Sequence, residues 1–180
     1  MQAHRRALVS EAEFLALPES TQRIELLDGE VIVSPSPTFW HQEILQRVVV
    51  ALRRWGSGRP VTVGLAPMDV RFQTGRILQP DAFVILGTVP RDHAGPLTQI
   101  PALCIEVVSG DRVYDRVTKR LIYARAGVRE YWVIEPAGLV ERFFGDDLGQ
   151  VEEVRGTLRT PVLDGFELDL GELFQVDEPG

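Results

Sequence analysis

Two acidic residues lie inside apolar stretches of the chain, Asp81 in "LQPDAFVIL" and Glu106 in "PALCIEVV". Both stretches have the composition of buried strands, where an isolated ionised carboxylate loses its hydration at a large free-energy cost. Each acid therefore needs a cation, a hydrogen-bond donor or a proton. A divalent metal shared by both carboxylates would satisfy them together. We therefore predict that Asp81 and Glu106 are the ligands of one metal ion.

The predicted ligands indicate which metal the site would take. Two carboxylates and a strand carbonyl leave coordination positions for water and for a substrate oxygen, which suits Mg²⁺ or Mn²⁺. Zinc is disfavoured because the three histidines of the chain show no ligand spacing. The single cysteine, Cys104, lies in the middle of a strand-like segment, where we expect it to pack as a small apolar group.

Lys119 is the basic residue placed to complete this group. It follows Asp115 by four residues and precedes Tyr123 by four, so a helix would align the three side chains on one face. A lysine there would position an attacking water or stabilise charge that develops on a phosphate. The alternative is an ordinary surface ion pair with Asp115, which contributes roughly a few tenths of a kcal/mol.

Both acids also have a purely structural explanation. Asp81 would cap a turn after Pro80 at the edge of a strand, and Glu106 would pair with an arginine such as Arg71. These alternatives need no metal and predict no chemistry.

The elements that would position these residues begin with two helices. Ser10 and Glu13 have the spacing of a capping box for a short helix that Pro18 ends. A longer helix follows, with Ser36 as its cap and Pro37 at its first helical position. Its apolar residues recur at helical spacing, at Ile44, Leu45, Val48, Val49, Leu52 and Trp55, and Gly56 and Gly58 end it.

Between these helices, Asp28-Gly29 joins two apolar runs and predicts a β-hairpin with a type I′ turn. That turn pairs Glu25 with Ile32 and places Glu25 on one sheet face with Leu27 and Ile32. A carboxylate on that face indicates a polar site, or else Glu25 is simply an exposed strand residue.

Three segments are each predicted to be a strand: "PVTVGLAPMDVRF" (60–72), "LQPDAFVIL" (78–86) and "PALCIEVV" (101–108). A helix from about Val113 to Ala126 follows and ends at Gly127, and a further strand lies at "EYWVIEP". The tail from Leu139 to Phe174 has the glycine spacing of a β-meander, with a short helix at "LGELF". We expect an α/β fold: a mixed central sheet flanked by helices, with an N-terminal hairpin and a C-terminal β-meander.

Composition limits the class of protein. A chain of 180 residues with 44% hydrophobic content predicts one domain spanning residues 1–180, with its core at about 10–175. The net charge of −7 argues against a protein that coats DNA. Local basic residues gather between Asp111 and Glu130, at Arg112, Arg116, Lys119, Arg120, Arg125 and Arg129. No stretch approaches the roughly 20 apolar residues of a membrane helix, so we expect a cytoplasmic protein with no membrane partner.

Three motifs carry a family resemblance: "PD" at Pro80-Asp81, "IEVVS" around Glu106, and "YDRVTKRLIYARAGVREYWVIEP", which begins at Tyr114. With "RIELLDGEVIVSPSP" and His41-Gln42, the chain resembles the putative restriction endonuclease family of the PD-(D/E)xK nuclease superfamily over about residues 10–175. The resemblance implies a restriction-endonuclease-like core in which Asp81 and Glu106 bind Mg²⁺ or Mn²⁺. The superfamily lysine usually lies two residues after the glutamate, where this chain has Val108. Families of this kind are thought to take the lysine from the following helix, which implies Lys119.

The same resemblance implies that the protein hydrolyses DNA phosphodiester bonds with a metal-activated water. Asp81, Glu106, Lys119 and Glu25 would be catalytic, because Glu25 matches the hairpin glutamate of the family. His41, Arg116 and Tyr123 are the predicted substrate contacts, although a helix-capping or surface role for His41 and a packing role for Tyr123 are the alternatives. By analogy with related nucleases that cut both strands, we expect a homodimer.

Two other functions stay open at this point. Val108 at the usual lysine position and the acidic net charge favour a catalytically inactive module that keeps the fold for nucleic-acid or protein interaction. A metal-dependent hydrolase that acts on a substrate other than DNA is the third alternative.

Overall fold

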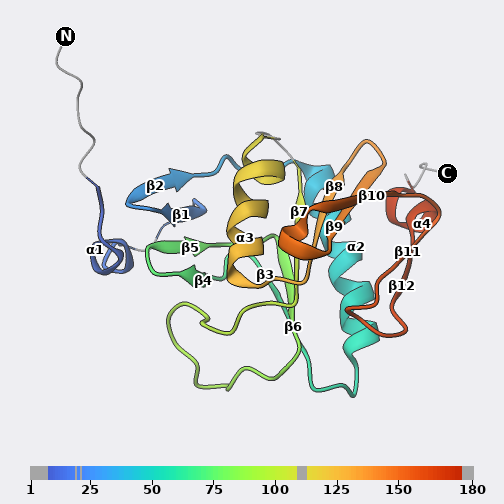
Figure 1. Cartoon of the computed structure of the whole chain (residues 1–180), viewed down its shortest axis with the longest axis horizontal. Coiled ribbons are helices and arrows are strands. Elements are labelled where there is room, and N and C mark those ends of the chain that lie inside the picture. The colour runs from blue at the N-terminus through green and yellow to red at the C-terminus, as the bar shows by residue number, and fades with distance from the viewer. Residues whose placement is uncertain (1–7, 19, 21, 109–112, 176–180) are drawn as a thin grey trace, which may run out of the picture.

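A mixed β-sheet forms the centre of the molecule (Figure 1). The computed structural model describes residues 8–18, 20, 22–108 and 113–175. Within these residues the central sheet has the strand order β10-β9-β8-β7-β6-β3, and β7 and β8 are its parallel pair. The strands are β3 (Thr62–Leu65), β6 (Ala82–Ile85), β7 (Leu103–Val107), β8 (Glu130–Glu135), β9 (Leu139–Phe144) and β10 (Gln150–Val154). The predicted mixed α/β fold is confirmed.

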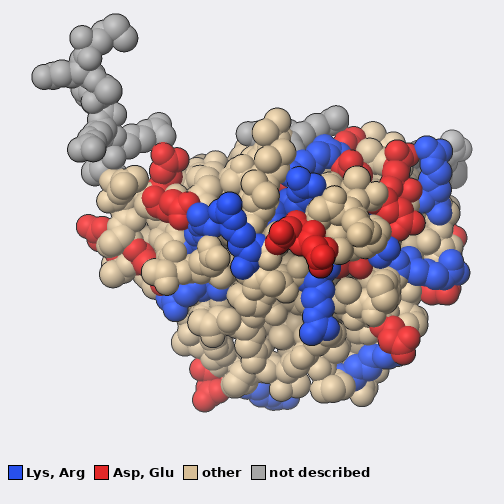
Figure 2. All heavy atoms as spheres, viewed as in Figure 1, with Lys and Arg blue, Asp and Glu red and all other residues tan. Residues whose placement is uncertain are grey.

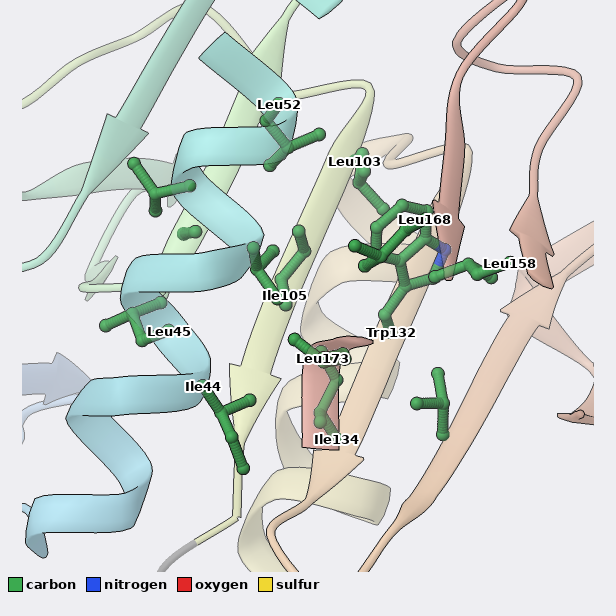
Figure 3. Packing of buried hydrophobic residues seen from close by; sticks show 14 of the residues in the cluster. Ile44, Leu45, Leu52, Leu103, Ile105, Trp132, Ile134, Leu158, Leu168 and Leu173 are labelled. Atoms are coloured by element: carbon green, nitrogen blue, oxygen red, sulfur yellow. The ribbon is translucent and has the colours of Figure 1, made fainter. Parts of the chain in front are cut away.

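Helices α2 (Phe39–Gly56) and α3 (Arg120–Ala126) cover opposite faces of this sheet. Because strand side chains alternate between faces, Leu103 and Ile105 of β7 pack with α2, whereas Cys104 packs on the side of α3. Figure 3 shows Ile44 and Leu52 of α2 on the side of β7, and Ile105 of β7 between the helix and Trp132 and Ile134 of β8. Burial of this apolar surface is the main stabilising contribution to the fold.

A smaller sheet of order β2-β1-β5-β4 contains the predicted hairpin. Asp28 and Gly29 have positive φ of 51° and 90°, as a type I′ turn requires. Leu27 pairs with Glu30 and Glu25 with Ile32, so the predicted register is confirmed. The strands are β1 (Ile24–Leu27), β2 (Glu30–Val33), β4 (Val70–Gln73) and β5 (Arg76–Leu78).

The predicted starts of the two N-terminal helices differ in outcome. Helix α1 (Glu11–Leu15) begins with the expected capping box of Ser10 and Glu13. Helix α2 begins later than predicted, because the Thr38 hydroxyl, not Ser36, accepts the His41 N–H at 3.2 Å. Pro37 therefore precedes the helix and is not its first residue.

Two segments that the sequence pattern presents as single strands are each divided between the two sheets. The run from Pro60 to Phe72 breaks at Pro67 into β3 and β4, since proline cannot donate a sheet hydrogen bond. Likewise "LQPDAFVIL" leaves β5 at Leu78 and enters β6 at Ala82. Asp81 therefore lies at the junction of the two sheets.

The third predicted helix has the expected extent but two geometries. Its first part is the π-helix η1 (Tyr114–Lys119), and α3 continues it to Gly127, whose φ of 92° ends the helix.

In the tail, β9 and β10 extend the central sheet as a meander after the parallel β8. The tail then forms a separate ribbon and a short helix, β11 (Thr157–Arg159), β12 (Glu167–Asp169) and α4 (Leu170–Phe174). The 3₁₀ turn η2 (Asp146–Leu148) links β9 and β10. Within the described ranges, no helix is both long and apolar enough to cross a membrane.

Candidate functional site

Asp81 and Glu106 lie on the same face of the central sheet. On β7, Glu106 is two residues from Cys104 and so lies on the same face as Cys104, the side of α3. Asp81 is two residues before Phe83 and four before Ile85, which also pack on the side of α3. Both acids are buried. The predicted convergence of the two acids on one site is therefore present, and it follows from strand alternation and from the pairing of β6 with β7.

The two carboxylate oxygens of Asp81 have different partners. Oδ2 of Asp81 accepts the Val107 N–H at 2.7 Å and lies 3.1 Å from His41 Nε2, whereas Oδ1 pairs with Arg23. The first two partners belong to β7 and to α2, so they fix the side chain to the sheet. The arginine was not anticipated from the sequence.

The two carboxylate oxygens of Glu106 also have different partners. Its Oε1 accepts the Tyr123 hydroxyl at 2.8 Å and pairs with Lys119 Nζ at 3.0 Å. Its Oε2 lies 3.4 Å from the Arg23 guanidinium. The arginine that pairs with Glu106 is thus Arg23 and not Arg71, which pairs with Glu11.

Glu25 contributes a third buried carboxylate from β1. Its Oε1 accepts the Gln79 N–H at 2.8 Å and lies 3.5 Å from Arg23. Its Oε2 accepts the Tyr114 hydroxyl at 3.2 Å. Glu25 is fully buried, so the alternative of an exposed strand residue is wrong.

Lys119 is buried among carboxylates. Its Nζ lies 3.0 Å from Glu106, 3.3 Å from Asp115 and 3.7 Å from Glu25. The pair with Asp115 exists as the surface alternative proposed, but the lysine is not at the surface. The π-helical turn brings Lys119 over the sheet face that carries Glu106.

Arg23 precedes β1 and has its guanidinium among the acids. It contacts Asp81 and the backbone carbonyl of Gln79, and it lies close to Glu106 and Glu25. A sequence signal for it existed: Arg23 and Glu25 are two residues apart, so an extended chain directs both to one face.

The ionisation of the site reflects burial and these charges. Burial raises the pKa of Glu106 to about 8, with Asp81 adding to the rise and with Lys119 and Arg23 opposing it. For Asp81, burial is outweighed by the His41 hydrogen bond and the Arg23 charge, which hold the pKa well below its usual range. Burial also opposes the charge on Lys119, but Glu106 and Glu25 outweigh it and raise the pKa of that ammonium. Nearby charges thus favour the ionised forms of Asp81 and Lys119, whereas burial favours the neutral form of Glu106.

The oxygen atoms around Arg23 are of the chemical type that hard divalent cations bind. Within the part of the chain that the structure describes, no group of three or more His, Cys, Asp or Glu side chains is arranged to hold a metal. Carboxylate oxygens of Asp81 and Glu106 and the Gln79 carbonyl nevertheless surround one cationic group. Mg²⁺ and Mn²⁺ prefer such ligands and complete their coordination with water.

The three predicted substrate contacts lie in different surroundings. His41 is buried against Asp81, and its Nδ1 has no partner among the described residues. Tyr123 is fully buried against Glu106. Arg116 pairs with Glu135 and Glu141. Their roles toward a substrate stay predictions, and Arg112 of the predicted basic segment lies outside the described residues.

Comparison with known proteins now decides the family. A model of the Uma2 family, described as "Putative restriction endonuclease", matches residues 11–171. The chain belongs to the Uma2 family. The predicted family is thus confirmed, and the match includes all four predicted catalytic residues of this Uma2 protein.

A solved structure shares the fold of this Uma2 chain. The crystal structure of a putative nuclease belonging to DUF820 from Anabaena variabilis ATCC 29413 superposes with a TM-score of 0.75. The two proteins are 23% identical, and the likeness covers 92% of this chain and 97% of that chain. At that identity the likeness shows the fold alone. No curated protein matches this chain.

Proposed function

We propose that this Uma2 protein is a Mg²⁺- or Mn²⁺-dependent endonuclease that hydrolyses DNA phosphodiester bonds. The observation that carries the proposal is the convergence of Asp81, Glu106 and the Gln79 carbonyl on one cation position, with Lys119 held 3.0 Å from Glu106. Family membership supports the reaction class, since restriction-endonuclease-like families generally use divalent metals.

Each residue has a role that its contacts support. Asp81 and Glu106 would hold the metal through the oxygens that now face Arg23, because their other oxygens are already bound to the protein. A bound Mg²⁺ or Mn²⁺ would supply a Lewis acid and a water of lowered pKa. Lys119 would offset negative charge that develops at the scissile phosphate. Glu25 would accept a proton or hold a water beside Lys119, which lies 3.7 Å away.

Three neighbours would support these residues. Tyr123 would fix the rotamer of Glu106 through its hydroxyl, and His41 would orient Asp81. His41 also lies in the first turn of α2 and is our candidate for a contact to a substrate phosphate.

The test is nicking of supercoiled plasmid in Mn²⁺ or Mg²⁺ by the purified protein. We expect the wild-type protein to nick, and Asp81→Asn and Glu106→Gln to lose at least about 100-fold of the rate, as loss of a charge-stabilising group typically costs. Glu130→Gln is the matched control: Glu130 is an equally buried glutamate on the neighbouring strand β8, paired with Arg142 outside the site. Equal loss in all three variants, or metal-independent nicking, would contradict the assignment.

A second function is favoured by one observation. Arg23 already neutralises both acids, which is the arrangement expected of a catalytically inactive module that binds nucleic acid or protein. Binding of labelled DNA without cleavage in either metal, unaffected by Asp81→Asn, would support the module instead of the nuclease.

A further inference from the structure

Arg23 occupies the position at which the metal ligands converge. Its guanidinium contacts Asp81 and the Gln79 carbonyl and lies 3.4 Å from Glu106 and 3.5 Å from Glu25. A metal bound to Asp81 Oδ1 and Glu106 Oε2 would have to approach the same two oxygens that pair with the arginine. The two cations would therefore compete for one place.

The two acids do not depend on Arg23 for their orientation. Asp81 keeps the Val107 N–H and His41 on its other oxygen, and Glu106 keeps Tyr123 and Lys119. Removal of the guanidinium would therefore expose one oxygen of each carboxylate and leave both side chains in place.

The two cations of the site, Lys119 and Arg23, differ in their exposure to solvent. The Lys119 side chain is 3% exposed and is surrounded by three carboxylates. The Arg23 side chain is 20% exposed, and its Nε has no partner among the described residues. Arg23 is thus the cation with a route to solvent.

Its backbone is held while its side chain reaches the site. The Arg23 carbonyl accepts the Ser34 N–H at 2.9 Å, which continues the β1–β2 hairpin. Rotation about the side-chain torsions would therefore suffice to withdraw the guanidinium, and the sheet need not change.

We propose that Arg23 is an exchangeable counter-cation of the site: it neutralises Asp81 and Glu106 in the metal-free protein, and a divalent metal binds only when its guanidinium swings out to solvent. The inference rests on the proposed function, because it assumes that these acids bind metal. It makes Arg23 an internal competitor that sets the metal concentration at which the site fills.

Metal affinity tests the proposal directly. We would titrate Mn²⁺ into wild-type protein and into Arg23→Gln, and measure free Mn²⁺ by its electron paramagnetic resonance signal. If the withdrawn state is about one tenth of the population, Arg23→Gln binds Mn²⁺ about tenfold more tightly. Arg142→Gln is the matched control, since Arg142 also pairs with a buried glutamate but outside the site, and its affinity should equal that of the wild type. Equal or weaker binding by Arg23→Gln overturns the proposal.

Thermal unfolding gives a second readout that does not depend on activity. In EDTA, Arg23→Gln should melt below the wild type, because the acids lose their counter-charge. Saturating Mn²⁺ should then raise its melting temperature more than that of the wild type. A variant that is less stable in EDTA but gains no more than the wild type from Mn²⁺ would assign Arg23 a structural role only.

Nuclear magnetic resonance of the wild-type protein avoids any risk that the variant fails to fold. The Arg23 guanidinium signals should be separate in EDTA and become averaged when diamagnetic Mg²⁺ saturates the site. Unchanged signals with Mg²⁺ bound would overturn the proposal. Plasmid nicking separates the two ideas: an inactive protein in which Mg²⁺ still releases Arg23 refutes only the nuclease, and an active protein with Arg23 unmoved refutes only the exchange.

Discussion

Lys119 is a buried ammonium that three carboxylates share. Its contacts with Glu106, Asp115 and Glu25 replace the water that burial removes. Removal of any one member of this group should destabilise the fold, because it leaves the remaining charges buried and uncompensated.

Lys119→Met should lower the free energy of unfolding by about 3–5 kcal/mol, the range for breaking a buried ion pair, and should abolish plasmid nicking. Urea denaturation measures the first effect. Asp115→Asn is the control, because it removes only the partner in the same helix. If both variants lose an equally small amount of unfolding free energy, Lys119 only forms an ordinary i,i+4 ion pair with Asp115.

Tyr123 and Tyr131 form a natural comparison, since both are fully buried and their rings contact each other. The Tyr123 hydroxyl donates to Glu106 at 2.8 Å, and the Tyr131 hydroxyl donates to the Asp115 carbonyl at 3.1 Å. We expect each Tyr→Phe change to cost about 1–2 kcal/mol in urea unfolding. Only Tyr123→Phe should also weaken Mn²⁺ binding, because it alone removes a hydrogen bond that holds the Glu106 carboxylate in position. If the two variants bind Mn²⁺ equally well, the positioning role of Tyr123 is wrong.

At the scale of elements, the edge strand β3 packs closely against β6 at a glycine. Gly64 pairs with Phe83 of β6, and a Cβ at Gly64 would overlap the Phe83 ring. Phe83 lies on the same sheet face as Asp81, so this close approach helps to set the strand that carries the acid.

Gly64→Ala should therefore destabilise the protein by about 1–3 kcal/mol, the usual cost of an added methyl group in a packed core. Gly87→Ala is the matched control, because a Cβ there would lie 3.8 Å from Ile85, an ordinary contact. Chemical denaturation of both variants gives the comparison, and similar midpoints would show that Phe83 moves away without cost.

The β1–β2 hairpin has its own pH dependence. Two hydrogen bonds of 2.8 Å from Arg76 hold the pKa of Asp28 below its ordinary value. A lowered pKa in the folded state stabilises the protein above the pKa of the unfolded chain, and this contribution is lost as the pH falls. The effect is small, since the Asp28 side chain is 58% exposed.

Asp28→Asn keeps a residue that tolerates positive φ but removes the charge. Its melting temperature should lie below that of the wild type near neutral pH, and the difference should shrink as the pH falls below about 4 and vanish below the lowered pKa of folded Asp28. Asp147→Asn is the control, because Asp147 has a similar φ of 54° and makes no ion pair within the described residues. A difference that persists at low pH would assign the effect to the backbone.

At the scale of the whole molecule, the charge pattern limits how nucleic acid could bind. Figure 2 shows basic and acidic side chains intermixed on the face that carries α3, without a continuous basic surface there. The net charge is −7, and Arg116 of the predicted basic segment is paired with Glu135 and Glu141. We therefore expect any electrostatic attraction of this face to DNA to be local.

A salt titration measures this directly. With Ca²⁺ in place of Mg²⁺, we expect the logarithm of DNA affinity to fall with the logarithm of salt concentration at a slope of about −2 to −4, equivalent to few phosphate contacts. Fluorescence anisotropy with a labelled duplex gives the slope. A value of about −6 or steeper would reveal an extended basic surface. The same samples in sedimentation velocity would test the predicted homodimer.

Local signals were sufficient for much of the fold. The turn residues Asp28-Gly29 and the capping box at Ser10 predicted their elements, because each depends on neighbours within a few residues. Predictions failed where contacts distant in sequence decide the outcome. The strand assignments around Pro67 and Asp81 were too long because the two ends of each segment pair with strands of different sheets.

The sequence by itself determined that Asp81 and Glu106 needed partners, since charged groups in apolar segments cannot be buried alone. Period-two alternation also determined that Glu25 would share a face with Leu27 and Ile32. Only the tertiary structure decided that Arg23, 58 residues before Asp81 and 83 before Glu106, would be the cation between them. The physical reason is that local pattern fixes which groups must be neutralised, whereas the packing of separate sheets fixes which opposite charge reaches them.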